Sequence, residues 1–205
     1  MIIKHYLYNT FTIENGNMKI AIDPGIHMNL FKMHSLIPKS EWESFSHVLV
    51  THGDPDHYAN ADKIANASDA AIICGKDLLK TENGNQYLIH PRKGGINNWI
   101  QFKDVVPLLP IGEEVKIGGV TIKGVKTQHD PKLIPFLGIK KRKVPGPKER
   151  TGIGAIGFQI NLKGKILINL GDTLFQPEWE GLKPDVLMLP IGGLGNNTWT
   201  LDVHD

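Results

Sequence analysis

Apolar and polar residues alternate over the first part of the chain, with the period of two that is typical of β-strands. Residues 2–7, 10–14 and 18–23 carry this pattern, and Asn15-Gly16-Asn17 separates the last two segments. Asn-Gly between two such segments is a strong signal for a hairpin turn. The chain is therefore predicted to begin with three short strands of one sheet.

A strand, a helix and a second strand are predicted between residues 47 and 74. The apolar run Val48-Leu49-Val50 belongs to a strand that ends at Thr51, and residues 58–68 have a helical pattern. The continuous apolar run 70–74 is typical of a buried strand in a parallel sheet. The polar segment 52–57 therefore connects a buried strand to the start of a helix.

The rest of the chain adds more strand than helix. Segments 113–126 and 155–170 alternate around Gly118-Gly119 and Lys163-Gly164, which predicts two hairpins. Further predicted elements are a helical turn at 40–44, a short helix within 75–85, a helical turn at 177–181 and a buried strand at 185–191. Predicted loops are 26–40, 90–98 and 132–151.

The segment between Thr51 and the predicted helix concentrates metal-ligating residue types. His52, Asp54, Asp56 and His57 stand within six residues. In extended backbone His52 and Asp54 share a face, whereas Asp56 and His57 fall in the turn and the helix start. Two such pairs indicate two adjacent ions, and imidazole with carboxylate suits zinc, iron or manganese. The alternative is that Asp54 or Asp56 caps the helix and the histidines are incidental.

The pattern His52-x-Asp54-x-Asp56-His57 resembles the H-x-H-x-D-H motif of the metallo-β-lactamase superfamily, with Asp54 in place of the second histidine. Three further segments match the family in order, so that the resemblance covers nearly all of the chain. These segments are 18–25 (MKIAIDPG), 126–129 (KTQH) and 170–173 (LGDT). The later 189–193 (LPIGG) is similar to the small metal-dependent hydrolases grouped with the ascorbate phosphate lactonases. The resemblance implies an α/β fold, a four-layer αββα sandwich.

The resemblance also implies a site and an activity. One ion is expected on His52, Asp54 and His129. A second is expected on Asp56 and His57, with Asp172 as the bridge. Asp56 and Asp172 are the expected catalytic residues of a metal-dependent hydrolase that uses a metal-bound hydroxide on an ester, lactone or phosphoester. The expected cofactors are two divalent ions, zinc first and manganese or iron as alternatives. The other functions considered are a catalytically silent metal-binding scaffold and a diiron redox protein.

The sequence departs from the family pattern at two places. Asp54 exchanges a nitrogen ligand for an anionic oxygen, which makes the site harder and more tolerant of manganese or iron. The family's final helix, strand and histidine are expected to be missing from a single domain over residues 1–205, and His204 is not assigned as that histidine. Truncation, a site completed by a neighbouring subunit of a homo-oligomer, and a weakly held second metal are left open.

Composition limits the classes of partner. Of the 205 residues, 40% are hydrophobic and 21% are charged, the values of a soluble globular chain, and the net charge of +2 gives no reason to expect nucleic acid. No apolar run reaches the length of a membrane span, and the first residues do not resemble a signal peptide. We therefore expect a cytoplasmic protein with a small-molecule substrate. The single Cys74 is expected in the core.

Two further features allow two interpretations each. Asp23, before Pro24-Gly25, either starts a turn or accepts a hydrogen bond from a ligand histidine through its carboxylate. Segment 132–151 is either a solvated loop or a basic flap that recruits an anionic substrate over the metals. Between positions 140 and 150 it has six basic residues: Lys140, Lys141, Arg142, Lys143, Lys148 and Arg150.

Overall fold

A mixed six-stranded sheet forms one half of the computed structural model, which describes residues 1–205 except 30–31, 130–131, 137–138, 145 and 191–205. Strands β3, β6, β7 and β11 are parallel, and β1 and β2 add an antiparallel edge. The three predicted N-terminal strands and the predicted parallel strand after the helix are confirmed. In spatial order the strands are β1 (Ile2–His5), β2 (Phe11–Asn15), β3 (Met18–Ile22), β6 (His47–Val50), β7 (Ala71–Gly75) and β11 (Val105–Leu108).

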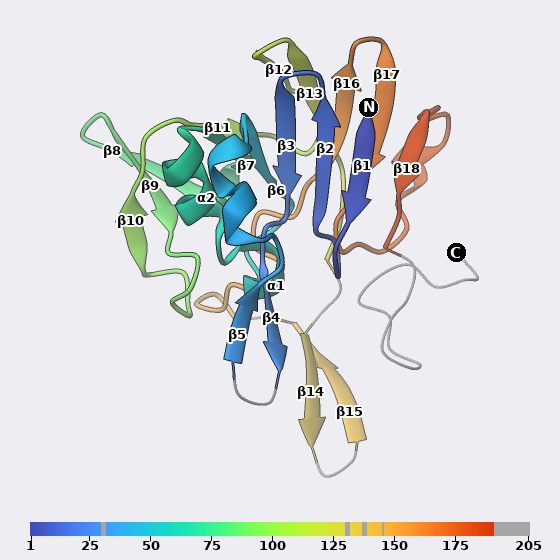
Figure 1. The fold of residues 1–205 in the computed structure, drawn as a ribbon. Helices are drawn as coiled ribbons and strands as arrows, with labels where there is room; N and C mark the ends of the chain where they lie inside the picture. The colour runs from blue at the N-terminus through green and yellow to red at the C-terminus, as the bar shows by residue number, and fades with distance from the viewer. Residues whose placement is uncertain (30–31, 130–131, 137–138, 145, 191–205) are drawn as a thin grey trace.

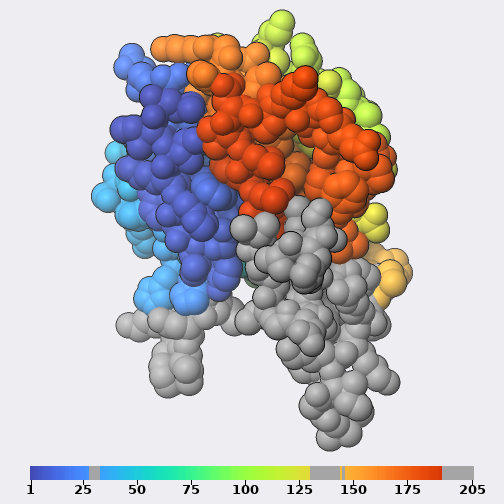
Figure 2. Space-filling view, turned by 90° about the vertical axis from the view of Figure 1, so that its right-hand side faces the viewer, coloured from blue at the N-terminus to red at the C-terminus, as the bar shows by residue number. Residues whose placement is uncertain are grey.

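A second, five-stranded sheet is built from the later part of the chain. The hairpins predicted around Gly118-Gly119 and Lys163-Gly164 are both present, and β18 pairs in parallel with β17. In spatial order the strands are β12 (Glu114–Ile117), β13 (Val120–Val125), β16 (Gly157–Leu162), β17 (Lys165–Asn169) and β18 (Val186–Met188). Figure 2 shows the N-terminal strands and the C-terminal strands side by side on one face of the molecule.

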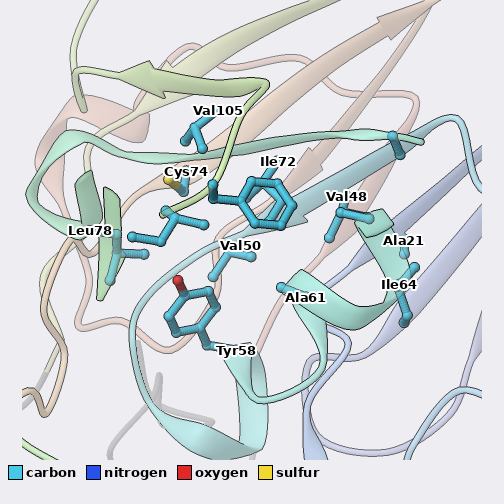
Figure 3. Close-up of a cluster of buried hydrophobic side chains, with 14 of the residues drawn as sticks. Ala21, Val48, Val50, Tyr58, Ala61, Ile64, Ile72, Cys74, Leu78 and Val105 are labelled. Atoms are coloured by element: carbon cyan, nitrogen blue, oxygen red, sulfur yellow. The ribbon is translucent and has the colours of Figure 1, made fainter. Parts of the chain in front are cut away.

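Strand β6 shows why the two sheets stack. Its side chains alternate between two cores: Leu49 packs with residues of both sheets, whereas Val48 and Val50 pack on the helical side. Figure 3 shows the helical-side cluster, in which Tyr58 and Cys74 lie among aliphatic side chains. Cys74 is a buried core residue, as predicted.

Helical segments cover the outer faces of the stacked sheets. The first sheet carries η1 (Lys39–Ser44), α1 (Pro55–Tyr58) and α2 (Ala61–Ser68), whereas η2 (Lys76–Leu78) follows β7 (Figure 1). On the outer face of the second sheet Ile168 packs with Trp179 of η3 (Pro177–Trp179) and with Leu182. The layers are therefore helix, sheet, sheet and the η3 segment, which confirms the predicted sandwich. No helix in the described part is long and apolar enough to cross a membrane.

The structure corrects two helix predictions. The helix predicted at 58–68 begins earlier and is divided into α1 and α2. The helix predicted within 75–85 is only the η2 turn followed by a hairpin of β8 (Leu79–Glu82) and β9 (Asn85–Ile89), which β10 (Trp99–Gln101) extends. Asn83 and Gly84, with φ of 50° and 76°, make the hairpin turn, because both residue types accept the left-handed conformation.

Two predicted loops are instead hairpins that project from the same end of the molecule (Figure 1). Segment 26–40 contains β4 (Ile26–Asn29) and β5 (Lys32–Ser35), and segment 132–151 contains β14 (Lys132–Phe136) and β15 (Ile139–Lys143). The side chains of 140–143 lie outside the described part. His204 also lies outside the described residues, so the expected lack of a final helix, strand and histidine stays a prediction.

Candidate metal centre

The segment with the predicted ligands leaves the carboxyl end of β6 and enters α1. Asp54 lies at the N-cap position of α1, with φ −72° and ψ 145°, but its side chain makes no capping hydrogen bond. Asp56 and His57 lie within the first turn of the helix. The alternative that Asp54 or Asp56 caps the helix with its carboxylate is therefore wrong, and these side chains point elsewhere.

The second sheet brings His129 and Asp172 to the same end of the sandwich. They follow β13 and β17, and both strands pair antiparallel with β16 between them, so they run in the same direction. Gly171, with φ 61°, allows this sheet to approach the first one closely: a Cβ there would lie 2.7 Å from Cβ of Thr51. The next residue, Asp172, is thereby brought to the end of β6.

Asp54 stands between two of the histidines. Its Oδ2 lies 3.5 Å from Nε2 of His52 and 3.4 Å from Nε2 of His129. The rings of His52 and His129 are 4.8 Å apart between centroids. These three side chains form the first group of the site: His52 follows β6, Asp54 precedes α1, and His129 follows β13.

His57 forms a second group with two other carboxylates. Its Nε2 lies 3.6 Å from Oδ2 of Asp56 and 3.5 Å from Oδ2 of Asp172. The rings of His52 and His57 have centroids only 4.1 Å apart, so the two groups are adjacent. The structure thus brings together all six residues predicted as ligands.

The donor atoms fit a metal ion. Ligand atoms of His52, His129 and Asp172 all lie within 4.8 Å of one another. Nε2 of His52 is buried and has no hydrogen-bond partner in the described part of the chain, a costly arrangement for a polar atom unless something else binds it. Imidazole nitrogens with carboxylate oxygens are the ligand types of zinc, manganese and iron sites.

Charge in this cluster is distributed between buried carboxylates and imidazoles. Burial alone would raise the pKa of the Asp54 and Asp172 carboxyls, but the surrounding histidines hold both pKa values below their usual range. Burial would lower the pKa of His57, yet Asp172 and Asp23 raise it well above the usual value. The groups therefore stabilise one another's charged forms, and carboxylates remain available as anionic ligands.

Asp23 orients the far side of His57, which is one of the two interpretations its sequence allowed. Its Oδ2 lies 2.8 Å from Nδ1 of His57, and this contact directs Nε2 toward the cluster. Oδ1 accepts the backbone N–H of Thr51 at 2.7 Å, and Oδ2 accepts the Thr51 hydroxyl at 2.5 Å. Asp23 also has φ 46°, so it makes the turn as well.

Two buried asparagines, which the sequence did not single out, join this network to the second sheet. Asn9 donates to Oδ2 of Asp23 at 2.6 Å and exchanges reciprocal hydrogen bonds of 2.9 and 3.0 Å with Asn169. Oδ1 of Asn169 also accepts the backbone N–H of Gly171 at 3.1 Å. Because they are 160 residues apart, no local pattern could have paired them.

Segment 150–153 supports the other side of the site. Gly152 donates its backbone N–H to Oδ1 of Asp54 at 3.2 Å, which leaves Oδ2 toward His52 and His129. Arg150 is buried, with 7% of its surface exposed, and it binds backbone carbonyls. Arg150 therefore fits neither interpretation of segment 132–151, the solvated loop or the basic flap, because its donors are satisfied by backbone carbonyls inside the protein.

A cavity of about 290 Å³ opens beside Asp54. Arg92 and Lys148 contribute cationic side chains to its lining, and Glu149 contributes a carboxylate. Arg92 also forms a two-pronged ion pair with Asp62, at 2.6 and 2.8 Å. The cavity is large enough for a small molecule, and of the candidate metal ligands Asp54 lines it.

Comparison with known proteins agrees with this geometry. A family model described as the beta-lactamase superfamily domain matches residues 3–205. A UPF0173 metal-dependent hydrolase of Agrobacterium fabrum is 34% identical over 193 residues, which are 90% of this chain and 70% of the relative. One from Alkaliphilus metalliredigens is 26% identical over 211 residues, 100% and 77% of the two chains. A solved metallo hydrolase from Ignicoccus hospitalis superposes with a TM-score of 0.64 at 21% identity, covering 98% of this chain and 73% of that one.

Proposed function

Because the chain belongs to the beta-lactamase superfamily, we propose that it is a metal-dependent hydrolase with a dinuclear centre. The observation that carries the proposal is the meeting of two ligand groups, one around Asp54 and one around His57, at the shared end of the two sheets. The names of the relatives, metal-dependent hydrolases of the UPF0173 group, support the same activity.

The six clustered side chains divide into two sets of ligands. His52, Asp54 and His129 would hold one ion. Asp56 and His57 would hold the other. Asp172 would bridge the sets, which is supported by its distance of 3.5 Å to His57 and by its grouping with His52 and His129. Two divalent ions, when bound, lower the pKa of a shared water and polarise the carbonyl or phosphoryl group that it attacks. Three carboxylates suit this pair because they offset the repulsion between the cations.

The Asp56 side chain is accessible to solvent, as expected of a residue that accepts a hydrogen bond from a water molecule. Its side chain is 46% exposed, whereas His57 beside it is 1% exposed. A carboxylate oxygen of Asp56 can therefore accept a hydrogen bond from the attacking water and orient it. The side chain of Asp172, in contrast, is 20% exposed, and its Oδ2 lies 3.5 Å from Nε2 of His57.

The cavity beside Asp54 supports a small-molecule substrate. An ester, lactone or phosphoester placed there would lie beside Asp54, with its remaining part toward Arg92 and Lys148. Cationic side chains at this wall favour a substrate with a carboxylate or phosphate group. Zinc is the first expected metal, and the oxygen ligand at Asp54 also favours manganese or iron.

The test combines metal analysis with hydrolysis. Protein purified without chelators should contain transition metal, and added zinc or manganese should raise the melting temperature of metal-stripped protein, because a ligand of the folded state stabilises it. A panel of lactones, phosphodiesters and thioesters is then assayed with wild type and Asp172→Ala. Equal rates for the two proteins would point to a catalytically silent metal-binding scaffold, and a lack of metal binding would refute the proposal entirely.

A further inference from the structure

Arg150 is a buried cation whose donors are all used on backbone carbonyls. Its Nε and Nη2 atoms both donate to the carbonyl of Gly53, Nη1 donates to His90 at 2.8 Å and Lys93 at 2.6 Å, and Nη2 also donates to Pro91 at 2.9 Å. It forms no ion pair with a carboxylate in the described residues. Burying a charge costs free energy unless hydrogen bonds or an opposite charge compensate it, so the burial of Arg150 calls for an explanation.

The Gly53 carbonyl, which accepts two hydrogen bonds from Arg150, belongs to the segment of candidate metal ligands. Gly53 lies between His52 and Asp54, and its N–H donates to the carbonyl of Ile153 at 2.9 Å. Both polar groups of Gly53 are therefore held by segment 150–153. The same segment supplies the Gly152 N–H that binds Oδ1 of Asp54 at 3.2 Å. Segment 150–153, almost a hundred residues away in the chain, thus holds the Gly53 backbone and the carboxylate of the next residue, Asp54.

Close packing makes this support rigid. Gly152 has φ 66°, and a Cβ there would lie 2.6 Å from Cβ of His129, another ligand of the first group. The guanidinium of Arg150 lies 5.7 Å from the centre of the Tyr58 ring, which closes its other side. Segment 150–153 therefore contacts the surroundings of both Asp54 and His129.

Electrostatics connects Arg150 to Asp54 as well. Burial lowers the pKa of Arg150, and the negative charge of Asp54 opposes that effect. A neutral histidine at position 54 would give no such compensation, whereas a carboxylate does.

We propose that Arg150 is a positioning residue for the metal centre: it fixes the Gly53 peptide and, through segment 150–153, the carboxylate of Asp54, so that Oδ2 of Asp54 faces His52 and His129. The inference rests on the proposed metal-dependent function. It identifies segment 150–153 as the support that allows an aspartate to serve as a ligand at this position.

The experiment measures metal affinity directly. Zinc and manganese dissociation constants are obtained by competition with a chelating dye, and the visible absorption of cobalt(II)-loaded protein reports the ligand geometry. Arg150→Gln should weaken binding at the first metal by about 10- to 100-fold, the usual effect of losing a partner that orients a ligand, and should shift the cobalt bands. Arg150→Lys keeps the charge but not the fork of donors, and should fall between wild type and Arg150→Gln.

Two comparisons separate positioning from a general structural role. Lys165→Gln removes a cation that donates to Asp185 at 2.7 Å and makes no contact with Gly53, and should leave affinity within about threefold of wild type. In an Asp54→His background the loss caused by Arg150→Gln should shrink to about threefold or less, because the Asp54 carboxylate that segment 150–153 holds is no longer present.

Each outcome has a distinct meaning. Unchanged affinity in folded Arg150→Gln, an equal loss in Lys165→Gln, or an equal loss in the Asp54→His background would overturn the inference. Should Arg150→Gln fail to fold, Arg150→Lys decides the question, and wild-type affinity in that variant refutes the positioning role. Wild-type protein that binds no metal would instead refute the proposed function, so the two failures are distinguishable.

Discussion

Removing the Asn9 side chain should reveal the buried contact that joins the two sheets under the candidate metal centre. Asn9→Ala removes three hydrogen bonds, one to Asp23 and two to Asn169. Each such bond contributes about 1 kcal/mol, and a buried group left unpaired costs about 1–3 kcal/mol. The remaining contact of the Asn169 amide nitrogen is with the sulfur of Met188 at 3.8 Å, a weak replacement. We therefore expect Asn9→Ala to lower the free energy of unfolding by about 2–4 kcal/mol.

The reciprocal pairing predicts a specific form of non-additivity. Asn169→Ala should cost a similar amount, but the double variant should cost less than the sum of the two by about 1–2 kcal/mol, because the second substitution removes a group that already lacks its partner. Urea unfolding of metal-free protein gives the free energies. For a chain of this size each kcal/mol also corresponds to about 2–4 °C in Tm.

The control and the metal readout complete this experiment. Asn97 is exposed, so Asn97→Ala should change stability by less than about 0.5 kcal/mol. Because Asn169 also binds the N–H of Gly171, next to Asp172, both buried variants should retain less of the second metal than Asn97→Ala does. Costs that simply add, or a loss below about 1 kcal/mol for Asn9→Ala, would show that this contact does not couple the sheets.

Three other predictions concern charge. Asp54→Ala should lower the metal content measured by elemental analysis, whereas Asp54→His should restore it with a preference for zinc; unchanged stoichiometry in Asp54→Ala would remove this residue from the site. Replacing the four basic residues of 140–143 by serine should lower kcat/KM for an anionic substrate about tenfold at low salt and leave kcat and metal content unchanged. The same loss with a neutral substrate would contradict recruitment by charge. Hydrogen bonding to Lys19 lowers the pKa of Glu41, so its stabilising effect is present above the unfolded value of about 4.3 and is lost as pH falls through the lowered pKa. Glu41→Gln should remove this acid-dependent component from urea unfolding curves, and curves that coincide with wild type at every pH would exclude it.

Sequence alone determined the elements whose signals are local. The alternation in the first 23 residues, the turn at Lys163-Gly164 and the apolar runs before Thr51 and at 70–74 were sufficient to predict strands that the structure contains. The cluster of His52, Asp54, Asp56 and His57 was also visible, because close spacing after a buried strand constrains where side chains can point. The helix predicted within 75–85 was wrong because Asn83-Gly84 can end a helix or turn a hairpin, and tertiary pairing with β10 decided for the hairpin.

Contacts between distant parts of the chain required the tertiary structure. The basic character of 140–150 gave no indication that Arg150 is buried, because burial depends on four backbone carbonyls from two other segments. Asn9 and Asn169 carry no local signal either, since an asparagine in a strand is as compatible with solvent as with a buried partner. The sequence by itself therefore determined the strands and the main group of candidate ligands. Only the packing of the two sheets decided which residues hold those ligands in place, because that depends on groups brought together by the fold and not by their spacing.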